Sequence, residues 1–263
     1  MTDRLLALDF DGVVADSAPE AFLVALRSFA SLWPETAVAR EACRLEALPS
    51  REALQASRLY APFRECMPLG NRAEDFGVVL AALEAGVSLP DQAAYDAFRS
   101  RHDEAWLMGF HRCFYQQRER LSSRHRQGWL ALMAPFATFV DVLRARAGQV
   151  TLAIATARDR RSVRILLEAY GIAGLVDDAL LLDKEVGRNK CAHLRVLAKR
   201  SGIVAADTRF LDDKLNHLSD VAELGVSCAL AAWGYNGERE QRCARKLGFP
   251  VCSLADVAAW GFD

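Results

Sequence analysis

The 263-residue sequence contains no Cys-x-x-Cys pair, no apolar run long enough to span a membrane and almost no net charge. Its seven cysteines are scattered and odd in number, which favours reduced thiols over a disulfide framework and argues against a zinc site. The 33 Lys and Arg residues nearly balance the 34 Asp and Glu residues, so nothing favours nucleic acid or an anionic membrane as a partner. The first residues also lack the pattern of a signal peptide. We therefore expect a cytoplasmic protein without a nucleic-acid or membrane partner.

The most informative stretch is an apolar run, Leu5 to Leu8, followed by Asp9, Asp11 and Gly12. Asp and Gly are common turn residues, so this short pattern by itself is also compatible with a plain strand end. Two carboxylates one residue apart repel each other, however, unless a cation or a shared proton compensates them. Mg²⁺, a hard cation that prefers oxygen ligands, would supply that compensation.

The remaining sequence contains two regions with different residue patterns. Residues 18–133 are rich in Ala, Leu, Arg and Glu, which predicts short helices separated by the prolines at positions 34, 49, 62, 68 and 90. Short apolar runs then alternate with helix-like segments, at residues 150–156, 179–182, 208–211 and 226–232. This alternation predicts an α/β fold with a doubly wound parallel sheet, whose first strand is residues 4–9. We expect a core of residues 1–17 and 134–263 and an inserted helical domain of residues 18–133.

Ligands of such sheets bind beyond the carboxyl ends of the strands, where useful side chains follow two later runs. Thr156 closes the run at 150–156, and its hydroxyl, with N–H groups at a helix start, can hold a phosphate oxygen. The alternative is that Thr156 only caps the helix that begins near Asp159. Asp212 and Asp213 follow the run at 208–211, and adjacent acids are costly to bury without a partner. This pair is therefore consistent with a cation site.

The string Asp-Phe-Asp-Gly-Val-Val-x-Asp-Ser, at residues 9–17, closely resembles the first signature of the haloacid dehalogenase superfamily of phosphatases. Later residues follow the order of that family's motifs, with Thr156 at the second, a lysine at the third and the pair Asp212 and Asp213 at the fourth. The resemblance implies a Rossmann-like core with an inserted all-helical cap, as in phosphoglycolate-phosphatase-like members. It covers residues 1–17 and those from about 135 onward.

Two lysines compete for the third motif. Lys190 begins a helix-like segment and lies 23 residues before Asp213, near the separation that is usual in the family. Lys184 lies 29 residues before Asp213. We therefore favour Lys190, although a cysteine follows it where the family commonly has proline.

The resemblance also implies roles for the acids. Asp9 would attack phosphorus and form an aspartyl phosphate, while Asp11 would act as general acid and base. The implied Mg²⁺-binding residues are Asp9, Asp11 through its backbone carbonyl, Asp213 and, supporting them, Asp212. The family usually has Asp or Asn a few residues further on, and here either Asn216 or His217 would serve.

Thr156, Lys190 and backbone N–H groups near Gly12 and Ala157 would hold the phosphoryl oxygens. In the helical stretch, Arg72 is a candidate clamp for an anionic substrate, and the alternative is an ordinary solvated arginine. These assignments predict Mg²⁺-dependent hydrolysis of a small phosphorylated metabolite by a monomer or a homodimer.

Other functions stay open on the same scaffold. A phosphomutase or phosphonatase would need further groups from the helical domain, and a catalytically weak relative would only bind a ligand or partner. The complete set of acids argues against that weak relative, and a dehalogenase would have no use for Asp11. A nicotinamide-binding domain is disfavoured because no G-x-G-x-x-G follows the first strand.

Overall fold

The computed structural model describes residues 2–70, 72–187 and 189–263. It divides into two compact units, which are the core unit (Met1–Asp16 and Ala134–Asp263) and the helical unit (Ser17–Met133). Ser17 therefore falls in the helical unit, one residue away from the expected boundary, whereas the second boundary falls between Met133 and Ala134. The role of the helical unit as a cap stays a prediction.

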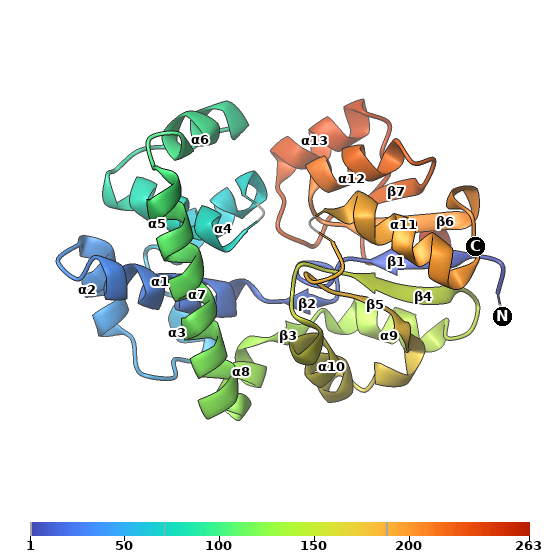
Figure 1. The fold of residues 1–263 in the computed structure, drawn as a ribbon, viewed down its shortest axis with the longest axis horizontal. Helices are drawn as coiled ribbons and strands as arrows, with labels where there is room; N and C mark the ends of the chain where they lie inside the picture. The colour runs from blue at the N-terminus through green and yellow to red at the C-terminus, as the bar shows by residue number, and fades with distance from the viewer. Residues whose placement is uncertain (1, 71, 188) are drawn as a thin grey trace. The chain divides into compact units, whose positions relative to one another are not determined.

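The core unit is built on a six-stranded parallel sheet with the strand order β5-β4-β1-β6-β7-β8 (Figure 1). Its strands are β1 (Leu5–Leu8), β4 (Thr151–Ala155), β5 (Val176–Leu182), β6 (Thr208–Asp212), β7 (Ser227–Ala231) and β8 (Val251–Cys252). Leu8 pairs with Ile154 of β4 on one side and with Leu211 of β6 on the other, so these three strands end side by side. Helices flank the sheet, which confirms the predicted α/β fold with a doubly wound parallel sheet.

Helices and short 3₁₀ turns connect the strands of the core unit. They are α9 (Ala137–Ala145), α10 (Arg160–Ala169), η2 (Ala173–Leu175), α11 (Lys190–Ser201), η3 (Ala205–Asp207), α12 (Leu215–Ala222), α13 (Glu238–Lys246) and α14 (Val257–Phe262). Asn189 fixes the start of α11, because its side chain accepts a hydrogen bond from the N–H of Ala192. Gly202 ends that helix with a φ of +73°, a conformation that suits glycine. Lys190 is therefore the first residue of a well-defined helix.

Two small strand pairings have no clear sequence signal. β8 is only two residues long, so neither alternation nor a long apolar run marks it. β2 (Ala15–Asp16) pairs in the antiparallel direction with β3 (Ala134–Pro135), where the chain leaves and re-enters the core unit. Pairing partners this far apart in the sequence cannot be read from either segment alone.

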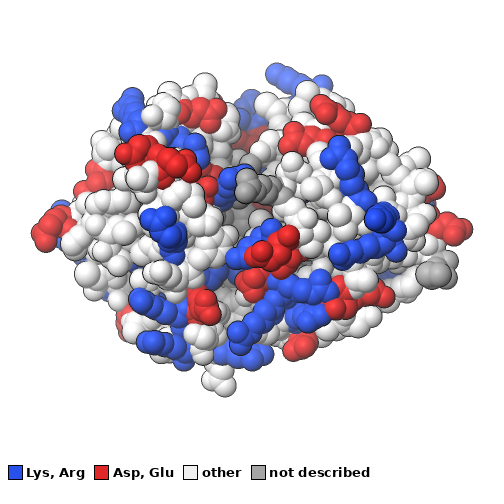
Figure 2. Space-filling view, viewed as in Figure 1, with Lys and Arg blue, Asp and Glu red and all other residues white. Residues whose placement is uncertain are grey.

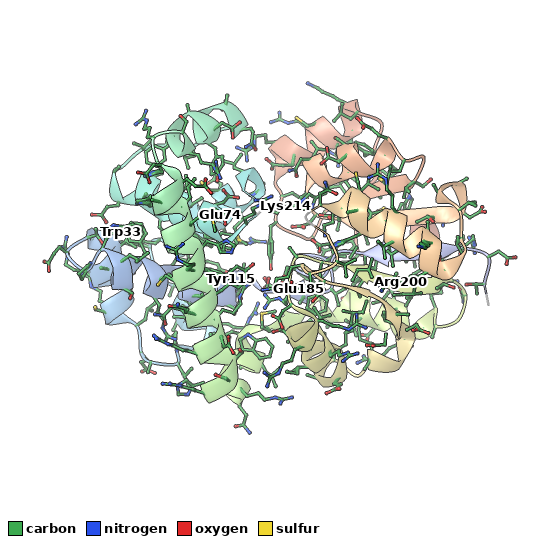
Figure 3. The ribbon with its side chains drawn as sticks, in the orientation of Figure 1. Trp33, Glu74, Tyr115, Glu185, Arg200 and Lys214 are labelled. Carbon is green, nitrogen blue, oxygen red and sulfur yellow. The ribbon has the colours of Figure 1, made fainter. Side chains whose placement is uncertain are left out.

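The helical unit contains α1 (Ala18–Leu32), α2 (Ala37–Arg44), α3 (Arg51–Gln55), α4 (Tyr60–Cys66), η1 (Met67–Leu69), α5 (Ala73–Glu84), α6 (Gln92–Arg99), α7 (Glu104–Arg124) and α8 (Arg126–Leu132). The helix α7 packs against both α1 and α5. At one end of this packing, Trp33 stacks on Trp106 with ring centroids 4.9 Å apart (Figure 3 labels Trp33). The expectation that Pro62 separates helices is wrong, because it lies in the first turn of α4, where its missing N–H costs nothing.

Charged side chains of both signs lie interspersed on the face shown in Figure 2, as the near-neutral composition predicts. Among the described residues, no helix has both the length and the hydropathy needed to cross a membrane.

A buried ion pair joins α1 to α7 within the helical unit. Arg118 donates from Nε and Nη2 to the two carboxylate oxygens of Glu20, at 2.8 and 2.9 Å, and its guanidinium carbon lies 4.6 Å from the ring centre of Phe114. The Glu20 side chain is 0% exposed, so solvent cannot replace the arginine. We expect Arg118→Met to lower the free energy of unfolding by about 3 kcal/mol, since one charge of a buried pair is removed. Urea denaturation followed by circular dichroism measures this loss.

The matched control is Arg112→Met, which changes an exposed arginine of the same helix. It should leave the unfolding free energy within about 0.5 kcal/mol of the wild-type value. Equal stability of the two variants would contradict a stabilising role for the pair.

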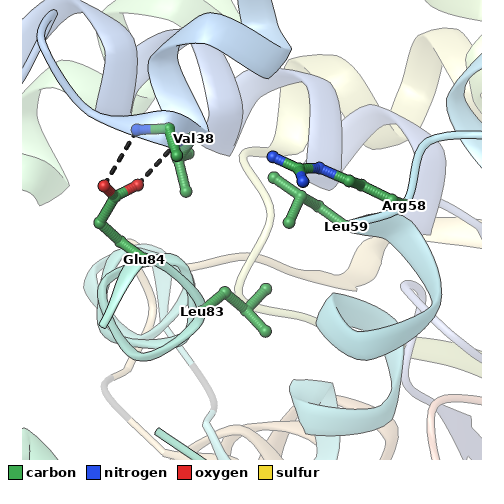
Figure 4. Close-up of a pocket in the computed structure, with 6 residues that line it drawn as sticks. Val38, Arg58, Leu59, Leu83 and Glu84 are labelled. Atoms are coloured by element: carbon green, nitrogen blue, oxygen red, sulfur yellow. Dashed lines mark hydrogen bonds between the residues drawn. The ribbon is translucent and has the colours of Figure 1, made fainter. Parts of the chain in front are cut away.

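A separate pocket of about 280 Å³ lies in the helical unit, lined by Ala37, Val38, Arg58, Leu59, Leu83 and Glu84 (Figure 4). The carboxylate of Glu84 accepts hydrogen bonds from the N–H groups of Ala37 and Val38, at 2.9 and 2.8 Å. This carboxylate thus occupies the start of α2, where an anion would otherwise bind. The chemistry indicated by the sequence motifs lies in the core unit instead.

Candidate active site

Asp9 and Lys190 form a buried ion pair at the end of the central strand. Asp9 directly follows β1, and its N–H donates to the carbonyl of Leu211 at 3.0 Å. Lys190 Nζ lies 2.7 Å from Asp9 Oδ1 and donates to the carbonyl of Ala155 at 2.6 Å. The N–H of Phe10 also donates to Asp9 Oδ1, at 2.7 Å. Two donors on one oxygen fix the rotation of the Asp9 carboxylate.

The two candidate lysines have different surroundings. The Lys190 side chain is 6% exposed and lies against Asp9, which follows β1, and Asp212, which ends β6. The Lys184 side chain is 38% exposed and lies 3.9 Å from Glu185, whose position Figure 3 labels. The structure therefore brings Lys190 to Asp9 and leaves Lys184 near the surface.

Asp212, the last residue of β6, has three hydrogen-bond or ion-pair partners. Its Oδ2 lies 3.0 Å from His217 Nδ1 and 3.4 Å from Lys190 Nζ, and its Oδ1 accepts from the N–H of Lys214 at 2.9 Å. Asn216 is exposed, so of the two candidates for the end of the fourth motif only His217 contacts Asp212. Burial favours the protonated form, but His217 and Lys190 outweigh it and lower the pKa of Asp212.

Ligand atoms of Asp9, Asp212 and His217 all lie within 4.8 Å of one another, a spacing compatible with a metal ion. The ammonium of Lys190 already contacts Asp9 and Asp212 in this cluster, at 2.7 and 3.4 Å. Burial alone would lower the pKa of Lys190, but Asp9 and Asp212 outweigh it and raise that pKa, so the lysine is charged. Lys190 therefore already offsets part of the negative charge of Asp9 and Asp212 in this cluster.

Asp213 follows Asp212 directly and is also buried. Its Oδ2 accepts a hydrogen bond from the N–H of Tyr235 at 2.7 Å, whereas its Oδ1 is buried and has no hydrogen-bond partner in the described structure. Burial and the neighbouring Asp212 raise the pKa of Asp213 well above its usual value. An orphaned, buried carboxylate oxygen fits a hard divalent cation. The buried oxygen of Asp213 therefore suits a hard divalent cation such as Mg²⁺.

The pKa of Asp9 is also affected by its burial. That burial raises the pKa of Asp9 to about 6, with Lys190 acting in the opposite direction and Asp212 adding to the rise. A cation bound nearby would stabilise the ionised form of Asp9.

The segment after β4 places Thr156 and Arg158 in the core unit. Thr156 is 1% exposed, and its Oγ1 accepts from the N–H of Arg158 at 3.1 Å. The interpretation that Thr156 caps the following helix is wrong, because Asp159 caps α10 by accepting from the N–H of Ser162. The Thr156 hydroxyl is thus not used by that helix. Ala157, beside it, is exposed.

Arg158 binds Asp11 through two of its nitrogens. Nε lies 3.0 Å from Asp11 Oδ2 and Nη2 lies 2.9 Å from Oδ1, and the Arg158 side chain is only 1% exposed. This arginine belongs to none of the four sequence motifs. Its only signal was its place in the polar run that follows an apolar strand, two residues after Thr156.

Gly12 turns the chain between Asp11 and the rest of the first motif. Its φ is +87°, and a Cβ there would lie 2.4 Å from Asp213 Oδ2, so glycine is required by both the backbone and the space. Its N–H donates to the carbonyl of Ala15 at 2.8 Å, so this loop itself uses the donor predicted to hold phosphate.

No family model matches the sequence, and no curated protein matches it at a significant level. Solved structures do match over nearly the whole chain. A provisionally assigned phosphoglycolate phosphatase from Lactobacillus delbrueckii subsp. bulgaricus is 14% identical, with a TM-score of 0.70 over 100% of this chain and 99% of that one. A predicted phosphoglycolate phosphatase from Haemophilus somnus is 18% identical, with a TM-score of 0.65 over 99% of each chain. A haloacid dehalogenase-like hydrolase from Streptococcus pneumoniae is 11% identical, with a TM-score of 0.60 over 99% of each chain.

The chain has the haloacid dehalogenase fold. The resemblance stated from the first motif is thereby confirmed for the fold. In this haloacid dehalogenase fold, the candidate residues of all four motifs come from the segments that follow β1, β4 and β6 and from the start of α11.

Arg72, the remaining candidate, belongs to the helical unit. Its side chain is 64% exposed and its Nη1 lies 4.0 Å from Glu74, which also contacts His111 Nδ1 at 2.8 Å (Figure 3 labels Glu74). The assignment of Arg72 to substrate binding stays a prediction.

Proposed function

We propose that this protein is a Mg²⁺-dependent phosphatase that hydrolyses a small phosphomonoester through an aspartyl phosphate on Asp9. The observation that carries the proposal is the charge arrangement around Asp9. Lys190 compensates Asp9 and Asp212, while Asp213 presents a buried oxygen that a cation would satisfy. A phosphate and a carboxylate repel each other, and both cations would offset that repulsion.

Asp9, the backbone carbonyl of Asp11 and Asp213 would hold the metal. When bound, Mg²⁺ supplies charge stabilisation to the phosphoryl group. The contacts of Asp9 Oδ1 with Phe10 and Lys190 orient the carboxylate for attack on phosphorus. Lys190 and the Thr156 hydroxyl would bind the phosphoryl oxygens.

Asp11 has two tasks in this proposal. It first gives a proton to the leaving oxygen as the bond from phosphorus to that oxygen breaks, and it later takes a proton from the water that cleaves the aspartyl phosphate. The two-point contact with Arg158 would hold the Asp11 carboxyl group in position for these tasks.

Metal removal tests the proposal directly. We expect EDTA to abolish hydrolysis of the best substrate and added Mg²⁺ to restore it, because the buried acids need a cation to act together. The measurement is phosphate release from a panel of phosphoglycolate, sugar phosphates, nucleotides and phosphoamino acids. Phosphoglycolate is the first choice because two structural relatives are named for it. Full activity in metal-free buffer, or no activity with any of these esters, would overturn the proposal.

A further inference from the structure

We infer that the loop after β7, residues 232–236, positions the metal-binding carboxylate of Asp213 against the turn at Gly12, and that Gly234 is the residue on which this positioning depends. We call this segment the β7 loop. The inference rests on the proposed function, because it concerns the same cation site. It adds positioning residues that the four motifs do not contain.

The β7 loop holds Asp213 by its side chain and by its backbone. The N–H of Tyr235 donates to Asp213 Oδ2 at 2.7 Å. Asn236 Nδ2 donates to the backbone carbonyl of Asp213 at 3.2 Å and to that of Ala231 at 2.9 Å. These contacts leave Oδ1 as the oxygen of Asp213 that is available to a cation.

Position 234 has room only for glycine. A Cβ at this position would lie 2.3 Å from the Cβ of Asp213 and 2.6 Å from the carbonyl oxygen of Gly12, both far inside contact distance. Its φ is not positive, so the backbone conformation itself would admit any residue. Gly12 approaches Asp213 as closely, since its own Cβ would lie 2.4 Å from Oδ2. The Asp213 side chain thus lies against two glycines from distant parts of the sequence.

The same loop also holds the turn that follows Asp11. Trp233 donates from Nε1 to the carbonyl of Val13 at 3.0 Å, and its ring packs on Phe139 with centroids 5.1 Å apart. The hydroxyl of Tyr235 lies 3.4 Å from Asp16 Oδ1. A third segment therefore fixes the two segments that would supply the carbonyl of Asp11 and the carboxylate of Asp213. Partners that orient metal ligands in this way typically change metal affinity when they are disturbed.

The test is Mn²⁺ binding to the purified full chain, with free Mn²⁺ measured by electron paramagnetic resonance. We expect Gly234→Ala to raise the Kd for Mn²⁺ by about tenfold or more while circular dichroism shows a folded protein. Trp233→Phe keeps a ring against Phe139 but removes the donor to Val13, so we expect a rise of roughly three- to tenfold. Gly174→Ala is the matched control, because a Cβ there meets no atom within 4 Å.

A merely structural role would lower the melting temperature without changing the Kd for Mn²⁺ of the folded protein. Unchanged Mn²⁺ affinity in folded Gly234→Ala overturns the inference. If Gly234→Ala does not fold, Trp233→Phe decides, and unchanged affinity in that variant overturns it equally. A wild-type protein that binds no Mn²⁺ and hydrolyses no phosphate ester overturns the proposed function itself, which separates the two failures.

Discussion

Asp9→Asn is expected to reduce kcat by at least about 10⁴-fold, because an amide cannot supply the attacking carboxylate oxygen. The variant should stay folded. The amide oxygen still accepts from the N–H of Phe10, and Lys190 keeps its contacts with Asp212 and the carbonyl of Ala155. Steady-state phosphate release and circular dichroism measure the two expectations.

Beryllofluoride gives a second readout for Asp9, since it mimics a phosphoryl group bound to a carboxylate. With Mg²⁺ it should raise the melting temperature of the wild-type protein and leave that of Asp9→Asn unchanged. Asp3→Asn, a change at an exposed acid near the same strand, should behave as wild type. Undiminished turnover in folded Asp9→Asn would rule out Asp9 as the nucleophile.

Lys190→Met is expected to lower kcat/KM by about 10²-fold or more, because it removes a charged contact to the phosphoryl group. It also leaves Asp9 and Asp212 buried without the ammonium that lies 2.7 and 3.4 Å from them. The free energy of unfolding should therefore fall by about 3 to 5 kcal/mol, the usual cost of breaking a buried ion pair. Kinetics normalised to folded protein, with urea denaturation, separate the two effects.

Lys184→Met is the matched control for Lys190. Its side chain is 38% exposed and its acidic neighbour, Glu185, lies 3.9 Å away, so its loss should change neither kcat/KM nor stability much. The opposite ranking of the two variants would move the third motif to Lys184.

The candidate site residues at the strand ends could be predicted where a short stretch of sequence marks the end of the strand. Asp9, Thr156 and the pair at 212 and 213 follow apolar runs, and parallel strands bring such ends to one edge of a sheet. Lys190 was identifiable because it begins a helix-like segment and lies 23 residues before Asp213. The positions of these residues can be predicted from their immediate neighbours in the sequence.

Other parts of the site depend on contacts between distant segments. Arg158 is 147 residues from Asp11, and the N–H of Tyr235 belongs to a loop whose own sequence gives no reason to bind Asp213. Nor could the sequence decide between Asn216 and His217. Adjacent residues of a helix point in different directions, and in the structure only His217 points toward Asp212. Such pairings follow from strand order and loop packing, which no local pattern encodes.

The position of β1 has a consequence for synthesis. This strand is synthesised before its two neighbours, β4 and β6, whose pairing residues Thr151 and Thr208 lie far downstream of Leu5. Its four residues are all buried in the finished sheet. During synthesis they have no strand partners until the helical unit has been made. Contacts across such separations close late and slow folding. A nascent chain that stops before β6 therefore leaves the backbone N–H and C=O groups along one edge of β1 without their strand partners.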